Sequence, residues 1–274
     1  MNTKKSKLLI IAMLYSIITL YILLSYNIVF AKEAGATFVT YAGQLSPAQL
    51  AVYDQIYAHA NAYDDSMFTL EQHLTEDDFD LAINYFFYEN PELYWLDTSY
   101  KYALNASNVV VKLQLNYLIS PDDIKSCDAL FESKLNAIIT QAAALDTPIE
   151  QERFIHDYIC SNTSYDENAP MNQSAFSALT SPTTVCAGYA RAFQIACNRL
   201  SIPCYYVTGT SKGINHAWNI VNIDGKYYNV DITWDDVISE SQNKPAYDYF
   251  NKSDAEFALD HTRSSHSMFL PTCD

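Results

Sequence analysis

The chain has 274 residues, 49% of them hydrophobic and 14% aromatic, a composition that excludes a largely disordered protein. Its formal net charge of −16 at pH 7 opposes binding to nucleic acid and to anionic membrane surfaces. The sequence has no basic patch, no glycine-rich phosphate loop and no metal-type spacing of Cys and His, so we expect no nucleic-acid partner, no cofactor and no metal.

The N-terminal segment is basic and then apolar. Three lysines within residues 4–7 precede an apolar run over residues 8–24, and residues 29–31 (Val-Phe-Ala) have the small-residue spacing of a signal-peptide cleavage site. An apolar segment of this length could instead span a bilayer as an uncleaved anchor. We expect residues 1–31 to be a signal peptide, with an anchor as the alternative. In both cases the rest of the chain is exported, and only this segment contacts the membrane.

Capping chemistry predicts four helix starts. Ser46, Ser120 and Thr147 each precede a proline and stand three residues before an acid or amide, and Ser253 stands three residues before Glu256. Together with the spacing of apolar residues, this predicts helices near residues 47–62, 76–88, 121–144, 148–162, 186–201 and 254–261. Strands are predicted near residues 99–104, 107–118, 204–209, 216–223, 227–233 and 246–250. The mixture predicts an α+β fold.

Cys186 is predicted to stand in the first turn of a helix. It follows a polar, turn-rich segment over residues 180–184, and apolar residues then recur at spacings of three and four until Pro203. At a helix start, free backbone N–H groups and the helix dipole favour a thiolate, and the same N–H groups could hold an oxyanion. The alternative interpretation is a buried structural cysteine.

A histidine and an aspartate are predicted to meet on the hairpin that follows. The Asp-Gly pair at 224–225 is the preferred two-residue type I′ turn, and it sets the register of the two flanking strands. In that register His216 and Asp231 are diagonal neighbours on one face, which predicts a hydrogen bond between them. Asp235 is the other diagonal neighbour and ranks second, because it lies past the strand end. An exposed polar face is the alternative interpretation.

Three short sequence motifs contain these residues. They are Val-Cys-Ala-Gly-Tyr-Ala at 185–190, His-Ala-Trp-Asn at 216–219 and Val-Asp-Ile-Thr-Trp-Asp at 230–235. In this order they resemble the core of the transglutaminase-like superfamily. The resemblance covers roughly residues 148–236, and more loosely residues 249–263.

The resemblance implies a papain-like core, in which a helix carrying Cys packs on an antiparallel sheet carrying His and Asp. It implies that Cys186 is a nucleophile, His216 its base and Asp231 the group that orients the base. The thiolate would attack an amide of a protein or peptide substrate, and water or an amine would resolve the thioester. Tyr165 and Gln173 are candidates, by chemical type alone, for a second oxyanion donor. The calcium-binding residues of animal transglutaminases have no counterpart here.

We expect residues 32–145, which carry no motif, to form an accessory α+β region, and residues 146–274 to form the catalytic domain. The alternative function is a non-catalytic cell-surface binding module on the same fold. The remaining candidates are expected to be structural: a helix-bracing Arg191, helical histidines within the core or at the surface, and solvated histidines on the tail (His59, His73, His156, His261, His266). We assign no disulfide among the six cysteines.

Overall fold

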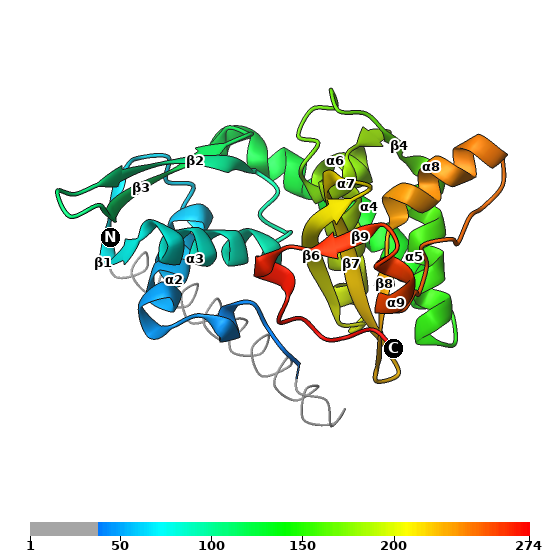
Figure 1. Cartoon of the computed structure of the whole chain (residues 1–274). Helices are drawn as coiled ribbons and strands as arrows, with labels where there is room; N and C mark the ends of the chain where they lie inside the picture. Colours follow the sequence, from blue (N-terminus) through cyan, green and yellow to red (C-terminus); the bar gives the residue numbers. More distant parts are fainter. Residues whose placement is uncertain (1–37) are drawn as a thin grey trace. The chain divides into compact units, whose positions relative to one another are not determined.

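The computed structural model describes residues 38–274, and Thr40–Asp274 form one compact unit (Figure 1). The predicted signal peptide or anchor at 1–31 lies outside the described residues. Within 38–274, none of the helices has both the length and the apolar character that a membrane crossing requires.

The elements alternate between helices and short strands along the chain. In order they are η1 (Ala42–Gln44), α2 (Pro47–Asn61), β1 (Phe68–Thr75), α3 (Glu76–Glu89), β2 (Leu96–Leu104), β3 (Val109–Tyr117), α4 (Pro121–Ala142), α5 (Pro148–Asn162), β4 (Ser164–Tyr165), α6 (Ala175–Thr180), β5 (Thr183–Thr184), α7 (Cys186–Arg199), β6 (Cys204–Ser211), β7 (Ile214–Ile223), β8 (Lys226–Val230), α8 (Ile232–Gln242), α9 (Asp254–Phe257), β9 (His261–Arg263) and η2 (Ser265–Ser267).

The four predicted helix caps are confirmed. Ser46, Ser120, Thr147 and Ser253 each accept a hydrogen bond from the backbone N–H three residues later. Each such bond satisfies one of the unpaired N–H groups of a helix start and stabilises it by about 1 kcal/mol. The local chemistry of the sequence therefore locates these helices correctly.

Two predicted segments after residue 245 differ from the structure. The helix predicted over 254–261 ends at Phe257, and the residues after it turn into strand β9. Residues 246–250 form no strand; the nearby pairing is an isolated bridge between Asn229 and Lys252.

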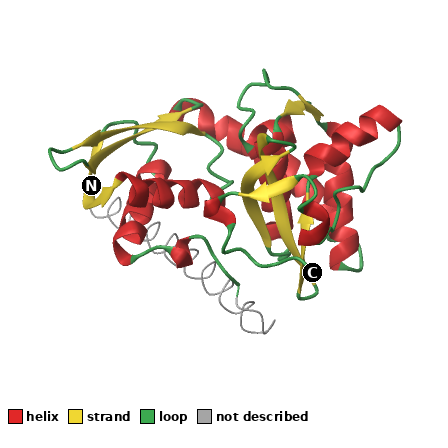
Figure 2. Ribbon diagram, viewed as in Figure 1, coloured by secondary structure: helices red, strands yellow, loops and turns green. Residues whose placement is uncertain are grey.

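The strands form three sheets within the described residues (Figure 2). The first is antiparallel, in the order β1-β3-β2, and α2 and α3 pack beside it. The second is antiparallel, in the order β8-β7-β6-β9, and α7 packs against β6 and β7. The third is a parallel pair of β4 and β5. The fold is α+β, with the cysteine-bearing helix packed on an antiparallel sheet, as expected.

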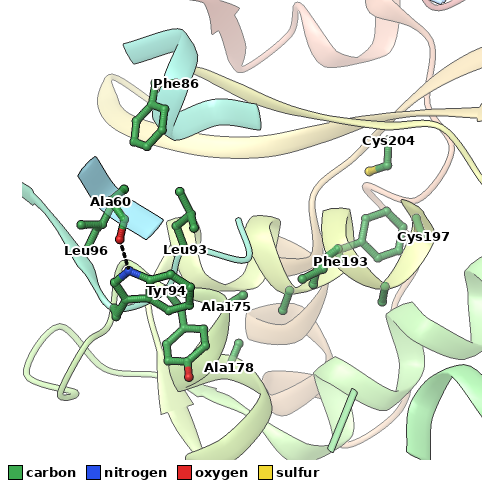
Figure 3. Packing of buried hydrophobic residues seen from close by; sticks show 14 of the residues in the cluster. Ala60, Phe86, Leu93, Tyr94, Leu96, Ala175, Ala178, Phe193, Cys197 and Cys204 are labelled. Atoms are coloured by element: carbon green, nitrogen blue, oxygen red, sulfur yellow. Dashed lines mark hydrogen bonds between the residues drawn. The ribbon is translucent and has the colours of Figure 1, made fainter. Parts of the chain in front are cut away.

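One buried cluster joins the N-terminal region to the rest of the unit. Phe86 and Leu96 belong to the same cluster as Ala175 and Phe193, and Figure 3 shows these side chains together. The dashed line in Figure 3 ends on the carbonyl oxygen of Ala60, which accepts from Trp95 Nε1 at 3.4 Å. Because this core is continuous, the accessory region is part of one packed unit.

The hairpin has the register predicted from its turn. Ile223 pairs with Lys226 and Asn219 with Val230, and Asp224 and Gly225 have the positive φ values of 52° and 87° that a type I′ turn requires. The strand ends earlier than predicted.

The early end of β8 follows from helix capping. β8 stops at Val230, and Asp231 is the N-cap of α8, where its Oδ1 accepts from Trp234 N at 3.2 Å. The prediction of a strand through residue 233 was wrong because this cap begins a helix.

Candidate active site

A cleft of about 570 Å³ lies at the N-terminal end of α7, next to β6 and β7. Its walls come from helix α3, residues 165–187, strands β6 and β7, and residues 264–266. The side chains and backbone that line it are those of Tyr88, Tyr165, Glu167, Asn172, Gln173, Val185, Cys186, Ala187, Tyr206, Thr208, Gly209, Asn215, His216, Ala217, Ser264 and His266. The cleft therefore holds four of the five predicted site residues and is the candidate site.

Cys186 is the first residue of α7, as predicted. The N-cap residue Val185 provides no side-chain cap, and its carbonyl accepts from the N–H groups of Gly188 and Tyr189. Among residues 38–274, the N–H groups of Cys186 and Ala187 have no hydrogen-bond partner. Two free donors and the positive end of the helix dipole therefore stand at the sulfur.

His216 lines the cleft with Cys186 and contacts Asp231. Its Nε2 lies 2.7 Å from Asp231 Oδ2, and its side chain is 4% exposed. Burial lowers the pKa of His216, but the charge and hydrogen bond of Asp231 and the hydrogen bond with Cys186 outweigh it and raise the pKa to about 10. An ionised carboxylate only accepts, so the Nε2 proton is on the histidine and Nδ1 is left for the sulfur.

Asp231 is buried and accepts three hydrogen bonds. Its Oδ2 faces His216 at 2.7 Å and His261 at 3.0 Å, and its Oδ1 accepts from Trp234 N. Burial raises the pKa of Asp231, but the charge and hydrogen bond of His216 and the hydrogen bond with His261 outweigh it and lower the pKa to about 2. The carboxylate of Asp231 is therefore ionised in the folded protein at neutral pH.

Asp235, the second-ranked carboxylate, does not contact His216. It lies one turn into α8, where its Oδ2 is 3.2 Å from His156 Nε2 and its Oδ1 accepts from Tyr249 N. Both the His156 and Asp235 side chains are buried, at 1% and 0% exposure. Helix α8 thus directs Asp231 and Asp235 to different imidazoles. The prediction assumed that the strand continues through residue 233, and it does not anticipate this separation.

The loop over residues 172–174 is held against α7 at two points. A β-carbon on Gly188 would collide with Thr184 Oγ1 and the carbonyl of Asn172, so glycine is required for this close approach. Arg191 Nη1 donates to the carbonyl of Gln173 at 2.5 Å, and its guanidinium lies 4.6 Å from the centre of the Tyr206 ring. Arg191, which was expected to brace its own helix, is buried and braces this loop.

Tyr165 and Gln173 both line the cleft. Burial first, and then the neighbouring charge of Cys186, raises the pKa of Tyr165, so its phenol keeps its proton and can donate. Gln173 Nε2 lies 3.4 Å from Asn172 Oδ1. The structure brings both candidates to the cleft without assigning a role to either.

Two features of the site were absent from the sequence prediction. His261, expected in solvent, is buried against Asp231. Tyr88, on α3 of the accessory region, lines the cleft, and its hydroxyl accepts from Thr208 Oγ1 at 3.3 Å. A strand as short as β9 has no periodicity, so nothing in the local sequence indicates that His261 is buried.

His216, Asp231 and His261 are also side chains of the metal-binding kind. Within residues 38–274, their ligand atoms all lie within 4.8 Å of one another. The hydrogen bonds from the two imidazoles to Asp231 account for these short contacts without an ion. That the protein needs no metal stays a prediction.

Residues 136–232 match the family model described as the transglutaminase-like superfamily, a range that contains all three residues Cys186, His216 and Asp231. This segment belongs to the transglutaminase-like superfamily. The family resemblance inferred from the three short sequence motifs is thus confirmed. The match supports the interpretation of the protein as an enzyme of the general transglutaminase-like kind.

Curated relatives match part of the chain. Kyphoscoliosis peptidase of Mus musculus is 31% identical over 151 residues, which are 49% of this chain and 20% of that protein. The Homo sapiens protein of the same name is 30% identical over 130 residues, 41% of this chain and 20% of that protein. The chain thus spans about a fifth of the length of the curated relatives it matches.

A solved structure of a TGase is similar over 51% of this chain and 45% of that chain, with 16% identity and a TM-score of 0.37. At this identity and TM-score, no activity is carried over from it.

Proposed function

We propose that the protein is an exported, cysteine-dependent enzyme that transfers the acyl group of a protein or peptide amide through a thioester. The observation that carries the proposal is that Cys186 and His216 line the same cleft, and that His216 Nε2 lies 2.7 Å from the buried carboxylate of Asp231. This is the arrangement that a thiol nucleophile, its base and an orienting group require.

The first half of the reaction forms the thioester. His216 Nδ1 takes the thiol proton, and the Cys186 sulfur attacks the amide carbon. The carbonyl oxygen becomes an oxyanion, which the free N–H groups of Cys186 and Ala187 are placed to hold, with Tyr165 or Gln173 as a further donor. The imidazolium then gives its Nδ1 proton to the amine nitrogen as the C–N bond breaks.

The second half releases the acyl group. Water or a second amine attacks the thioester carbon, His216 removes the proton of the attacking group, and the sulfur leaves as a thiolate. Attack by water makes the enzyme a protease or deamidase, and attack by an amine makes it a transglutaminase. The accessory region contributes Tyr88 to the cleft wall, and we propose that it takes part in substrate recognition.

A non-catalytic binding module is the rival function, and thiol chemistry separates the two. The test is the rate of iodoacetamide alkylation of Cys186 between pH 5 and 9, measured by peptide mapping. Cys127, which is also partly exposed, is the internal control in the same digest. We expect Cys186 to react well below about pH 8.5, the value of an unperturbed thiol, and His216→Gln to remove this reactivity. If Cys186 follows the pH dependence of Cys127, the binding module is the better assignment.

The reaction type needs a separate measurement. A glutamine-containing peptide is incubated with the protein, with and without an added primary amine, and the products are identified by mass. Incorporation of the amine indicates a transglutaminase, conversion of Gln to Glu a deamidase, and chain cleavage a protease. Cys186→Ser should abolish whichever product appears.

A further inference from the structure

His261 contacts the same oxygen as the proposed base. Strand β9 is an edge strand of its sheet and pairs with β6, with Ser211 opposite His261, and Figure 1 shows β9 beside β6. His261 Nε2 lies 3.0 Å from Asp231 Oδ2, the atom that also faces His216 Nε2 at 2.7 Å. Asp231 thus stands between two imidazoles, whose ring centres are 5.8 Å apart.

The His261 ring is fixed by its surroundings. Its side chain is 1% exposed, and its centre lies 4.4 Å from that of Phe257 and 5.1 Å from that of Trp218. The strand that carries it can approach β6 because Gly209 has no side chain. A β-carbon there would collide with the carbonyl of Thr262 and the ring of Trp218. The backbone and the packing therefore hold the imidazole in one orientation.

Both ring nitrogens of His261 face carboxylate oxygens. On the side away from Asp231, Nδ1 lies 2.6 Å from Asp260 Oδ1, and Asp260 Oδ2 accepts from the Tyr249 hydroxyl at 2.6 Å. Ionised carboxylates only accept hydrogen bonds, so the imidazole is the donor in either contact.

We propose that His261 is a positioning residue of the active site. With Asp260 behind it, His261 holds the Asp231 carboxylate so that Oδ2 stays in line with His216 Nε2. The proposal rests on the proposed function, in which His216 is the base. His261 does not touch the substrate; it acts through Asp231.

Other charged or titratable groups surround His216, Asp231 and His261, and the test leaves these groups unchanged. Lys212 on the turn between β6 and β7 places its amino group 3.5 Å from the centre of the Trp234 ring and 5.4 Å from that of Tyr249. Asp231 and Asp260 face the two imidazoles directly, and the Tyr249 ring centre lies 5.5 Å from that of His261. Since the test changes His261 alone, their contribution is the same in every variant.

Two isosteric substitutions separate the contact with Asp231 from the contact with Asp260. His261→Gln can place an amide N–H near the position of Nε2, facing Asp231, whereas His261→Asn can place one near Nδ1, facing Asp260. The measured quantity is the alkylation rate of Cys186 by iodoacetamide at pH 6, in the full chain. We expect His261→Asn to slow alkylation by about tenfold or more, as the loss of an orienting partner does at other sites, and His261→Gln to slow it by less than about threefold.

A second measurement follows His216 itself. In ¹⁵N-histidine-labelled protein, NMR gives the titration midpoint of the His216 ring, assigned with His216→Gln. His261→Asn removes the donor that faces Asp231, so the carboxylate is free to turn away from His216, stabilises its imidazolium less, and the midpoint should fall. A residue that only fills space would not produce this shift. His59→Gln is the matched control, because it breaks a His–Asp contact of 2.8 Å with Asp64 far along the chain from the site.

Several outcomes would overturn the proposal. One is equal alkylation in both variants together with an unchanged His216 midpoint. Another is a loss of alkylation that merely follows the loss of folded protein seen by circular dichroism. If the parent Cys186 is itself unreactive at pH 6, the proposed function fails instead. The His216 midpoint then still decides the role of His261, because it does not depend on the thiol.

Discussion

His156 Nε2 lies 3.2 Å from Asp235 Oδ2, so two aspartates one helical turn apart contact two different buried imidazoles. Asp231 faces His216 at 2.7 Å. Asp235 lies further along α8, and its buried contact with His156 joins α8 to α5. Burial lowers the pKa of His156, but its hydrogen bonds with Asp157 and Asp235 outweigh this and hold the pKa well above the ordinary value. The first aspartate belongs to the proposed site, and the second to the core.

This division predicts opposite phenotypes for two similar substitutions. Asp231→Asn should cut turnover by about 10⁴, the loss known for that change in serine triads, because an amide does not hold the imidazole in the required tautomer. Asp235→Asn should mainly lower stability, since it disturbs a buried pair. Turnover, or Cys186 alkylation at neutral pH, and thermal unfolding measure the two effects. The reverse pattern, with Asp235→Asn inactive and Asp231→Asn mild, would remove Asp231 from the triad.

Cysteine substitutions should separate chemistry from packing in the same way. Cys186→Ser should abolish acyl transfer and leave the unfolding midpoint nearly unchanged, because Cys186 is only partly buried at a helix start. Cys197→Ala should keep the activity and cost about 1–3 kcal/mol, because Cys197 is fully buried. Denaturant unfolding and a peptide assay measure both. Full turnover by the Cys186 variant would disprove the enzyme assignment.

Stability should depend on pH through Glu152. Its side chain is buried, Oε2 accepts from Asn251 Nδ2 at 2.9 Å, and Oε1 has no partner within residues 38–274. Burial, partly opposed by the Asn251 hydrogen bond, raises its pKa from 4.5 to about 7. The folded protein then binds this proton more tightly than the unfolded chain, so the free energy of unfolding falls as the pH rises from about 4.5 to about 7.

Replacing the ionisable side chain of Glu152 should therefore stabilise the protein. Glu152→Gln has no proton to lose, and we expect it to be more stable than the parent by about 2 kcal/mol at pH 8 and by much less at pH 4. Denaturant unfolding at the two pH values measures the difference. Glu132→Gln, at an exposed pair with Arg199, is the control and should change stability by less than about 0.5 kcal/mol. A gain that is the same at both pH values would refute the linkage.

The N-terminal segment predicts a processed, exported protein. Mass spectrometry of the secreted fraction should find a chain that begins at Lys32. An intact form recovered from membranes would indicate the anchor, and recovery from the cytosol would contradict both.

Chelation should leave the chemistry intact. EDTA should not change the alkylation rate of Cys186 or the turnover, because hydrogen bonds satisfy His216, Asp231 and His261 without an ion. A loss of activity that is restored by a divalent cation would show that these three side chains hold a metal.

The sequence alone determined the parts of this protein that depend on neighbouring residues. The Asp224-Gly225 turn needs two positive φ values, which this pair tolerates, and it therefore set the hairpin register that brings His216 near Asp231. The helix caps are equally local, because a cap joins residues only three apart. The place of Cys186 at a helix start follows from the polar segment before it and the apolar spacing after it.

The tertiary structure alone decided which distant groups meet. His261 is buried because a three-residue strand closes on β6 at Gly209, and so short a strand has no periodicity to predict it. Asp235 contacts His156, 79 residues away, because α8 begins where the hairpin was expected to continue. Tyr88 reaches the cleft because α3 packs on β6. Such contacts depend on how helices and sheets pack, and the local propensities that locate each element carry no information about that packing.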